Sequence, residues 1–581
     1  MRSKLSMGLV AIAATVAILL AAHGSLLYAQ PVGSITLPDP GVTEQLYQGC
    51  NNVSLTFPDG TASETVVEAV TPSGALQAIW HHNAAQNRFE GFSPTAPQAS
   101  DLLAVDFLDA VWLCMAGPAP AVAPSPGAVS PPTAPTQLAC TRSVAPDGSD
   151  DNPGTGEAPW QTIQHAADAA QPGDTVCVGS GDYSAEGELR FSLSGTADSP
   201  ITFGAAPGGT VTVQALTLNP GTSYLRLVGF AVQGFPIWGV TLLGDNHNIL
   251  LSHLAVSGGE AGFRLTEGNS GENPASGPVS DVILEDSVIR DSMYTAVDCT
   301  PGPCDQTVFR RLEIYGSGLE AGFGGDGLGL ERGRDVVVED CFIHDNGGDG
   351  IDLNSRDFAG NVPGIVVRRN RVARNHLQGI KLWAGGRMEN NVVWGQGIAP
   401  VALGMHPGAY EVVNNTIAYN MYSTDYSERD YAFVAAYPNP DTGTSAAIQL
   451  TLVNNIFAFN TSPQVGDGPT GIYSGEGVQL TEHHNLYWSR EDGEIQADFV
   501  SGHDVLFTRA EVSDGTWTSV TGQGQGDVTA DPLFVSGWSE VDLHPQAASP
   551  AVGAGSGGGA PSDDAEGRPR TGTPDIGAYE R

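Results

Sequence analysis

A short β-type pattern recurs along this chain and is the feature that most limits its fold. Six segments share an apolar residue, two mostly polar residues, a small or amide residue, any residue, and a β-branched or apolar residue. They are LEDSVI at 284, VEDCFI at 338, VRRNRV at 367, MENNVV at 388, VVNNTI at 412 and LVNNIF at 452. Their fourth place holds Ser287, Cys341, Asn370, Asn391, Asn415 and Asn455. Short strands that recur in this way, with amides stacked at one turn, predict a solenoid of parallel strands.

A second repeat runs out of phase with the first. It comprises AGFRL at 261, TAVDC at 295, DGLGL at 326, DGIDL at 349 and QGIKL at 378. Side chains alternate along a strand, so the apolar third and fifth places point into the core and the fourth place points outward. The outward column is Arg264, Asp298, Gly329, Asp352 and Lys381. Neighbouring parallel strands lie about 4.8 Å apart, so we expect Asp352 and Lys381 side by side in one groove.

The N-terminus predicts export. Arg2 and Lys4 precede an apolar run, and Leu27-Tyr28-Ala29 forms a small-residue cleavage site before Gln30. We therefore expect a signal peptide over residues 1–29, a secreted protein, and no attachment to a membrane after cleavage. Removal of Lys4 leaves Lys381 as the one lysine, although the full sequence carries 23 arginines.

Composition suggests the domain boundaries. Residues 116–138 contain seven prolines and no charge, as expected of an extended linker. A small disulfide-closed β-rich module is expected over 30–115, a right-handed parallel β-helix over 139–530, and a closing segment over 531–581. Residues 144–183 predict a turn, an amphipathic helix from about Gln161 to Ala170 and a first strand. These residues and the tail resemble the caps of exported β-helix proteins.

Seven cysteines suit an exported protein. Their positions suggest three local pairs and leave Cys341 unpaired, although sequence alone does not fix the connectivity. The suggested pairs are Cys50–Cys114, Cys140–Cys177 and Cys299–Cys304.

The net charge of −40 excludes nucleic acid as a partner. The charge is uneven, because the window from Glu331 to Asn390 contains nine acidic and nine basic residues and is neutral. Solubility or a saline habitat accounts for the excess of acidic residues in the rest of the chain. Separately, we expect the protein to be a monomer.

Three aspartates are expected to converge on adjacent coils. Asp326 and Asp349 hold the first place of the second repeat, and Asp352 holds the fourth. Carboxylates in such a group repel one another unless a cation lies between them, and oxygen ligands suit Ca²⁺. The alternative is that an aspartate beside a glycine simply caps a turn.

The motifs GGDGLGL (324–330), NGGDGIDLN (346–354) and QGIKLWAGG (378–386) resemble the active-site coils of polysaccharide lyase family nine. The resemblance implies a pectate-lyase-like β-helix that binds Ca²⁺ through Asp326, Asp349 and Asp352. It also implies that Lys381, in the GIKL strand, is the catalytic base. The sequence departs from the family at Gly348, where an aspartate is expected, so we expect weaker Ca²⁺ binding.

Lysine suits this chemistry better than arginine. β-Elimination removes the C5 proton of a uronate and expels the 4-linked oxygen, and Ca²⁺ on the carboxylate stabilises the developing charge. The base must be an uncharged amine with a pKa below the free value of about 10.4, whereas arginine stays charged. Arg356 and Arg387 are candidates to bind substrate carboxylates.

Two other functions fit the same sequence. A β-helix of this composition can be a scaffold that binds glycans without catalysis. A glycoside hydrolase would use paired carboxylates, for which Asp349 and Asp352 are candidates. If the protein is a polysaccharide lyase, the expected partner is an acidic, uronate-containing polysaccharide.

Overall fold

The computed structural model divides the chain into two compact units, Met1–Gly127 and Ala128–Arg581. The residues it describes are 33–36, 43–46, 49–54, 61–71, 76–83, 88–92, 104–105, 110–115, 138–266, 277–319, 325–354, 364–383, 385–420, 433–435, 448–460, 472–474, 478–488, 494–498, 505–536 and 541–581. The expected signal peptide and nearly all of the proline-rich linker lie outside these ranges. No helix among the described residues is long and apolar enough to cross a membrane.

In its described residues the first unit contains antiparallel strands and the helix α2 (Ser63–Ala69). Its strands are β1 (Gly33–Thr36), β2 (Thr43–Leu46), β3 (Gly49–Ser54), β4 (Thr61–Ala62), β5 (Val70–Thr71), β6 (Leu76–Asn83), β7 (Arg88–Phe92), β8 (Ala104–Val105) and β9 (Ala110–Met115). They form the sheets β2-β1-β5, β3-β9-β6-β7 and β4-β8. Cys50 lies directly opposite Cys114 in the β3–β9 ladder. The bond expected between their side chains lies outside the described residues.

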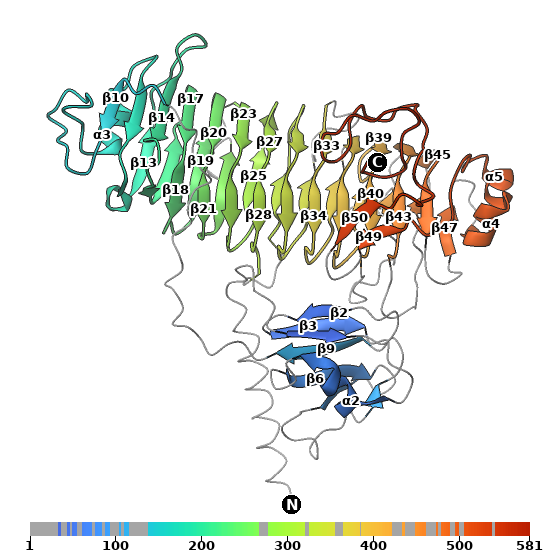
Figure 1. Cartoon of the computed structure of the whole chain (residues 1–581). Helices are drawn as coiled ribbons and strands as arrows, with labels where there is room; N and C mark the ends of the chain where they lie inside the picture. Colours follow the sequence, from blue (N-terminus) through green and yellow to red (C-terminus); the bar gives the residue numbers. More distant parts are fainter. Residues whose placement is uncertain are drawn as a thin grey trace, which may run out of the picture. The chain divides into compact units, whose positions relative to one another are not determined.

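The second unit is the expected parallel β-helix, in which successive coils contribute strands to three long sheets (Figure 1). The first sheet contains β10 (Arg142–Val144), β11 (Thr175–Val178), β14 (Ile201–Ala205), β17 (Ser223–Val228), β20 (His247–Ser252), β23 (Val279–Glu285), β26 (Cys304–Asp305), β27 (Val308–Arg310), β30 (Val337–Glu339), β33 (Val366–Arg368), β36 (Gly386–Glu389), β39 (Gly408–Val413), β42 (Ile448–Val453) and β45 (Val478–His483).

The second sheet contains β12 (Gly181–Asp182), β15 (Val211–Val213), β18 (Phe230–Gln233), β21 (Ala255–Ser257), β24 (Val288–Arg290), β28 (Glu313–Tyr315), β31 (Phe342–His344), β34 (Arg371–Ala373), β37 (Val392–Trp394), β40 (Thr416–Ala418), β43 (Ile456–Ala458) and β46 (Leu486–Trp488). The third sheet contains β13 (Glu188–Phe191), β16 (Ala215–Leu218), β19 (Trp238–Leu243), β22 (Ala261–Thr266), β25 (Val297–Gly302), β29 (Leu328–Leu330), β32 (Ile351–Leu353), β35 (Ile380–Leu382), β38 (Val401–Leu403), β41 (Phe433–Ala435), β44 (Ile472–Ser474), β47 (Glu494–Asp498) and β48 (Val505–Thr508).

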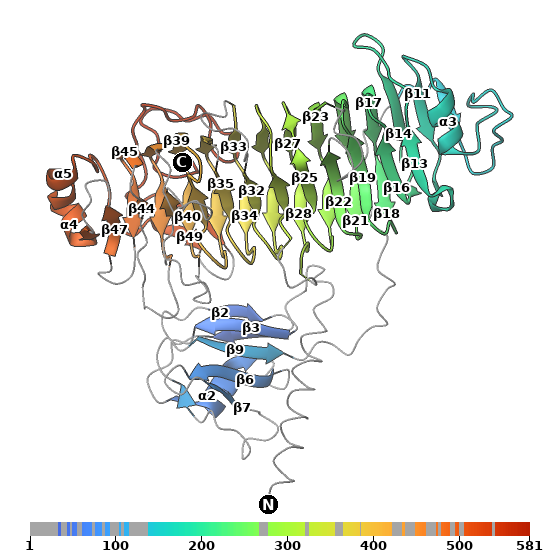
Figure 2. The ribbon, with the colours of Figure 1, turned by 180° about the vertical axis from the view of Figure 1, so that it is seen from behind.

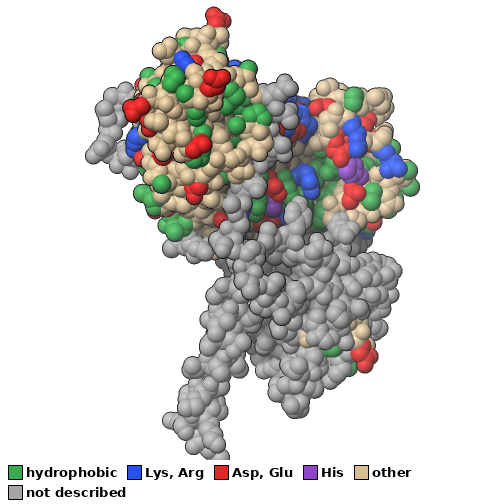
Figure 3. All heavy atoms as spheres, turned by 60° about the vertical axis from the view of Figure 1, so that its left-hand side comes forward, with side chains coloured by type: hydrophobic (Ala, Val, Ile, Leu, Met, Phe, Trp, Pro, Cys, Tyr) green, Lys and Arg blue, Asp and Glu red, His purple; other side chains and the backbone are tan. Residues whose placement is uncertain are grey.

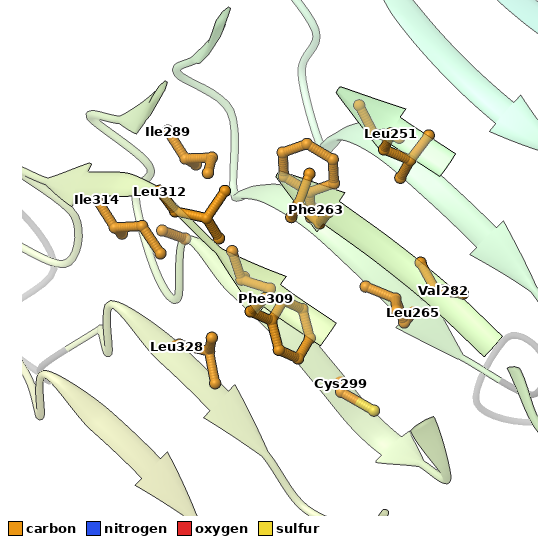
Figure 4. Packing of buried hydrophobic residues seen from close by; sticks show 14 of the residues in the cluster. Leu251, Phe263, Leu265, Val282, Ile289, Cys299, Phe309, Leu312, Ile314 and Leu328 are labelled. Carbon is orange, nitrogen blue, oxygen red and sulfur yellow. The ribbon is translucent and has the colours of Figure 1, made fainter. Parts of the chain in front are cut away.

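Apolar side chains from all three sheets fill the inside of each coil. The third and fifth places of the second repeat are buried in every coil, as their alternation predicts: Phe263, Leu265, Val297, Cys299, Leu328, Leu330, Ile351, Leu353, Ile380 and Leu382. Figure 4 shows Phe263, Leu265 and Cys299 of the third sheet with Phe309 of the first and Ile289 of the second. A core built in this way repeats from coil to coil.

The first repeat marks the turn from the first sheet to the second. Its third place has a left-handed backbone in all six segments, at Asp286, Asp340, Arg369, Asn390, Asn414 and Asn454. Asn and Asp tolerate this conformation better than most residues. The amide at the fourth place then accepts from the backbone N–H of the preceding coil, for example Asn370 N to Asn391 Oδ1 at 3.1 Å. The stacked amides expected from the sequence are confirmed.

A second amide ladder lies five residues further along and was not expected. Asn346, Asn375, Gln396, Asn420 and Asn460 each accept from the backbone N–H of the preceding coil. The two ladders enclose the three-residue strands of the second sheet. They favour one register between neighbouring coils, because each amide oxygen accepts from the equivalent residue of the preceding coil.

Both ends of the β-helix are closed. Helix α3 (Ile163–Ala169), capped by Thr162, packs into the core as the sequence predicts. At the far end β48 runs antiparallel to β47 and leads into α4 (Arg509–Ser513) and α5 (Thr516–Thr521), and β49 (Phe534–Ser536) pairs with β50 (Asp542–Pro545). The tail returns along the first turn, where Asn390, Asn414 and Asn454 donate to its carbonyl groups. The disulfides Cys140–Cys177 and Cys299–Cys304 and the free, buried Cys341 are confirmed.

Removing one ladder amide should destabilise the β-helix strongly. Asn391→Ala deletes the acceptor of Asn370 N and the donor to the Val367 carbonyl, both buried. An unsatisfied buried group costs about 1–3 kcal/mol, so we expect a loss of about 3 kcal/mol in the free energy of unfolding. Denaturant unfolding measures this, with Gln449→Ala at an exposed strand position as the control. Equal stability of the two variants would contradict a stabilising role for the ladder.

Candidate active site

The outward column of the second repeat is continuous in the third sheet. Its register pairs Arg264 with Asp298, Asp298 with Gly329, Gly329 with Asp352, and Asp352 with Lys381. Figure 2 shows the strands that carry these residues, β22, β25, β32 and β35, along one sheet. The expected placement of Asp352 beside Lys381 on adjacent coils is therefore confirmed.

Lys381 forms the centre of a compact charged cluster. Its Nζ lies 2.8 Å from Asp349 Oδ2 and 2.8 Å from Asp352 Oδ2. It also lies 4.3 Å from the ring centre of Trp383. The lysine side chain is only 13% exposed, and Asp349 and Asp352 are buried. The groups lie outside the apolar core but are largely shielded from solvent, which strengthens the interactions between them.

Asp326 and Asp349 each bind the backbone of a neighbouring coil through one carboxylate oxygen. Asp326 Oδ1 accepts from Asp349 N at 2.8 Å, and Asp349 Oδ1 accepts from Gln378 N at 2.9 Å. The turn-capping role considered from the sequence is thus present. It leaves Oδ2 of each residue for other partners, so capping and cation binding are compatible.

The electrostatics of the cluster reflect burial and crowding. Burial, followed by the charges of Asp349 and Asp352, raises the pKa of Asp326 well above its ordinary value. Burial also raises the pKa of Asp352, to about 7, although Lys381 opposes the shift. Burial lowers the pKa of Lys381, but Asp349 and Asp352 outweigh it, so this pKa is raised. With these partners alone the lysine is a charged ammonium.

A hard divalent cation fits this donor set. Asp326, Asp349 and Asp352 each offer an oxygen, and the three oxygens lie within 4.8 Å of one another. Asp352 Oδ1 is buried and has no hydrogen-bond partner within the described part of the chain. An unpaired buried carboxylate oxygen beside two further carboxylates is the kind of site that Ca²⁺ occupies in proteins.

Gly348 is required by the packing of this turn. A Cβ at residue 348 would lie 2.5 Å from Asp326 Oδ1, 2.8 Å from Gly325 C and 3.0 Å from Asp326 N. Two of these atoms belong to the backbone, so a side chain cannot be accommodated by a rotamer change. An aspartate at position 348 would therefore clash with the neighbouring turn, so the difference from the family at this position affects packing as well as the number of carboxylate ligands.

The two arginines expected to bind substrate are not brought to the cluster. Arg356 lies outside the described residues. Arg387 lies on β36 of the first sheet, where it pairs with Glu389 and Glu411 and donates to the carbonyl of Gly559. A role in substrate binding would require Arg387 to exchange these partners.

The neutral window reflects ion pairs between coils. Arg368 pairs with Glu339, Arg369 with Asp340, and Arg374 with Asp345, each one coil away. Basic side chains also lie among acidic ones on the face drawn in Figure 3, which brings the end of the β-helix near α3 forward. Arginines in this window therefore offset local carboxylates.

Three residues near the cluster were not singled out from the sequence. Asn354 donates to Asp352 Oδ2 at 3.3 Å and to Glu331 Oε1 at 3.4 Å, and Trp383 faces Lys381. Glu331, Asn354 and Trp383 each lie one residue after the fifth place of the second repeat. The same alternation that selects the fourth place also points this sixth place outward, so the sequence contained the signal.

Part of the chain is similar to a known β-helix family. Residues 142–420 match the family model of the Pel9A-like, right handed beta helix region. A segment of 88 residues, 15% of this chain, is 41% identical to Pectate lyase PEL9 of Emericella nidulans. A segment of 242 residues, 41% of the chain, is 24% identical to the uncharacterized protein YwoF of Bacillus subtilis. These matches span about a fifth and two fifths of the two relatives' lengths.

The crystal structure of pectate lyase Pel9A is also similar, with 16% identity and a TM-score of 0.44 over 77% of this chain and 98% of that one. Residues 142–420 are therefore similar to a pectate-lyase-like right-handed β-helix, as the active-site motifs suggested.

The packing at Gly348 generates a test. Gly348→Ala should lower the unfolding temperature and weaken Ca²⁺ binding, because the new Cβ displaces Asp326 and the turn around it. Gly557→Ala, where a Cβ meets nothing within 4 Å, is the matched control. Thermal unfolding and calorimetric titration with Ca²⁺ measure both effects. If Gly348→Asp bound Ca²⁺ more tightly than the wild type, this account of the turn would be wrong.

Proposed function

We propose that this pectate-lyase-like β-helix is a secreted, Ca²⁺-dependent polysaccharide lyase that cleaves a uronate-containing polymer by β-elimination. The observation that carries the proposal is the position of Lys381, within 2.8 Å of both Asp349 and Asp352, on the strand that matches the lyase motif. The similarity to the pectate lyase PEL9 supports the reaction class. The family match also covers all three coils that supply the cluster.

Asp326, Asp349 and Asp352 would hold the cation. When bound, Ca²⁺ supplies positive charge that offsets the three carboxylates and polarises the carboxylate of a uronate. The chain's own residues fix the site, because Asp326 and Asp349 are bonded to neighbouring coils and Asp352 lies on a strand between two others. Because these carboxylates are already held in place, they need not move when negative charge develops on the substrate during removal of the C5 proton.

Lys381 would take the C5 proton at Nζ. An amine accepts a proton only in its neutral form, and Asp349 and Asp352 favour the charged form unless their own charge is offset. A cation bound at these aspartates would offset their charge and so favour the neutral form of Lys381 that accepts a proton. Trp383 covers one side of the lysine and limits the positions of Nζ.

The same geometry bears on the two alternatives. In a glycoside hydrolase one carboxyl group must donate a proton while the other acts as nucleophile or base. Asp349 and Asp352 instead share one lysine, an arrangement that favours the lyase. A glycan-binding scaffold would not need a shielded lysine among three carboxylates, but it remains the outcome if elimination fails.

Replacing the lysine by arginine should separate a base from a structural cation. Lys381→Arg keeps the charge next to Asp349 and Asp352, so we expect an unchanged fold but a loss of about a hundred- to ten-thousandfold in elimination rate. Absorbance of the unsaturated product near 235 nm measures the rate on uronate polymers with Ca²⁺. Arg226→Lys, at an exposed strand position, is the reciprocal control. Near-wild-type activity of Lys381→Arg would show that Lys381 is not the catalytic base.

The cation can be tested independently of activity. Calorimetry should detect weak Ca²⁺ binding to the wild type and none to Asp349→Asn, because affinity follows the number and charge of the ligands. Asp198→Asn, an exposed residue away from the site, should bind as the wild type does. Equal binding by wild type and Asp349→Asn would place the ion elsewhere.

A further inference from the structure

A pocket on the third sheet lies along the same face as the lysine cluster. It has a volume of about 240 Å³ and takes its lining from β19, β22, β25 and the turns before them. The lining residues are Trp238, Glu260, Ala261, Arg264, Tyr294, Thr295, Asp298 and Thr300. None of them belongs to the cluster assigned to Ca²⁺ and the base.

The strand register connects the pocket with the cluster. Arg264 and Asp298 occupy the same outward column as Asp352 and Lys381, separated from them by Gly329. Strands are about 4.8 Å apart, so the pocket lies roughly 15–20 Å from Lys381 along this column. Gly329 places no side chain between the two sites, and the position its Cβ would take is flanked by Thr295 Cγ2 at 3.2 Å and Asp326 Oδ2 at 3.5 Å.

The pocket carries the groups that recognise a sugar ring. The Arg264 guanidinium lies 4.8 Å from the ring centre of Trp238 and donates to Asp298 Oδ2 at 2.6 Å. Tyr294 is 46% exposed, and its neighbour Met293 is 45% exposed. Aromatic faces pack against the C–H face of a pyranose, and a guanidinium–carboxylate pair donates to and accepts from its hydroxyl groups.

The charges of the pocket select the kind of sugar. Arg264 is already paired with Asp298, and Glu260 adds a further carboxylate. The pocket therefore has no excess positive charge for a free uronate. A sugar unit without a free carboxylate, either neutral or esterified, avoids repulsion by Glu260 and Asp298.

From these observations we infer that the Trp238–Arg264–Asp298 pocket is a substrate subsite that binds an uncharged sugar unit about three to four units from the bond cleaved at Lys381. The inference rests on the proposed function for the position of cleavage. The substrate would thus be a polymer that carries neutral or esterified units among its uronates and lies across successive coils.

Binding to the catalytically silent Lys381→Arg background tests the pocket separately from the reaction. The probes are oligogalacturonates of about eight units, long enough to reach from Lys381 to the pocket, in methyl-esterified and fully de-esterified forms. We expect Trp238→Ala to weaken binding of the esterified probe about tenfold and of the de-esterified probe less than twofold. Trp238→Phe, which keeps a ring, should restore most of the affinity. Trp488→Ala, which removes a Trp–Arg contact on the second sheet, should change neither.

Kinetics then distinguish failure of the pocket from failure of the proposed function. In the active enzyme Trp238→Ala should raise KM for long esterified chains about tenfold, leave kcat unchanged, and leave KM unchanged for oligomers too short to reach the pocket. An unchanged affinity in Trp238→Ala, an equal loss for both probes, or no binding of either probe would overturn the subsite. If Trp238-dependent binding persists while the wild type eliminates no substrate, the subsite stands and the lyase fails.

Discussion

Coil-to-coil hydrogen bonding at fixed register is the constraint on which the rest of this structure depends. Parallel strands alone would tolerate a slip, but the buried amide oxygen at the fourth place of the first repeat accepts from the backbone of its equivalent in the preceding coil. The second amide ladder repeats this condition at the other end of the short strands. In the coils that carry both ladders, these two fixed points help decide which side chains become neighbours on the third sheet.

The candidate site is a direct product of that register. Asp352 and Lys381 are 29 residues apart in sequence, and the β32–β35 ladder makes them neighbours. Asp326 and Asp349 add carboxylates from two successive coils and use one oxygen each to hold the coil beside them. Stability and chemistry thus share the same side chains, which explains why the site can keep two buried carboxylates, a partly buried one and a lysine in place.

The face of the third sheet also changes character along its length. Near Lys381 it presents carboxylates suited to a cation, and three to five strands away it presents Tyr294 and Trp238 beside a neutralised ion pair. A polymer aligned with the strand stack would meet these surfaces in succession. The first sheet, by contrast, carries ion pairs between coils, such as Arg368 with Glu339.

The sequence by itself determined the periodic part of this protein. Alternation along a strand is a local rule, so it placed Phe263 and Leu265 inside and Asp352 and Lys381 outside without knowledge of the coils around them. The disulfides Cys140–Cys177 and Cys299–Cys304 and the free Cys341 were also anticipated, because the partners are close in sequence or the count is odd.

Only the tertiary structure decided the contacts that no local rule describes. Arg387 contacts Glu389, Glu411 and the returning tail rather than the cluster. The sequence did not reveal the contact with the tail, because Gly559 lies 172 residues further along the chain. The packing of Gly348 against Gly325 and Asp326 depends on the turn of the preceding coil. Burial of the lysine cluster depends on what surrounds it in three dimensions, which a pattern of residue types along one strand does not contain.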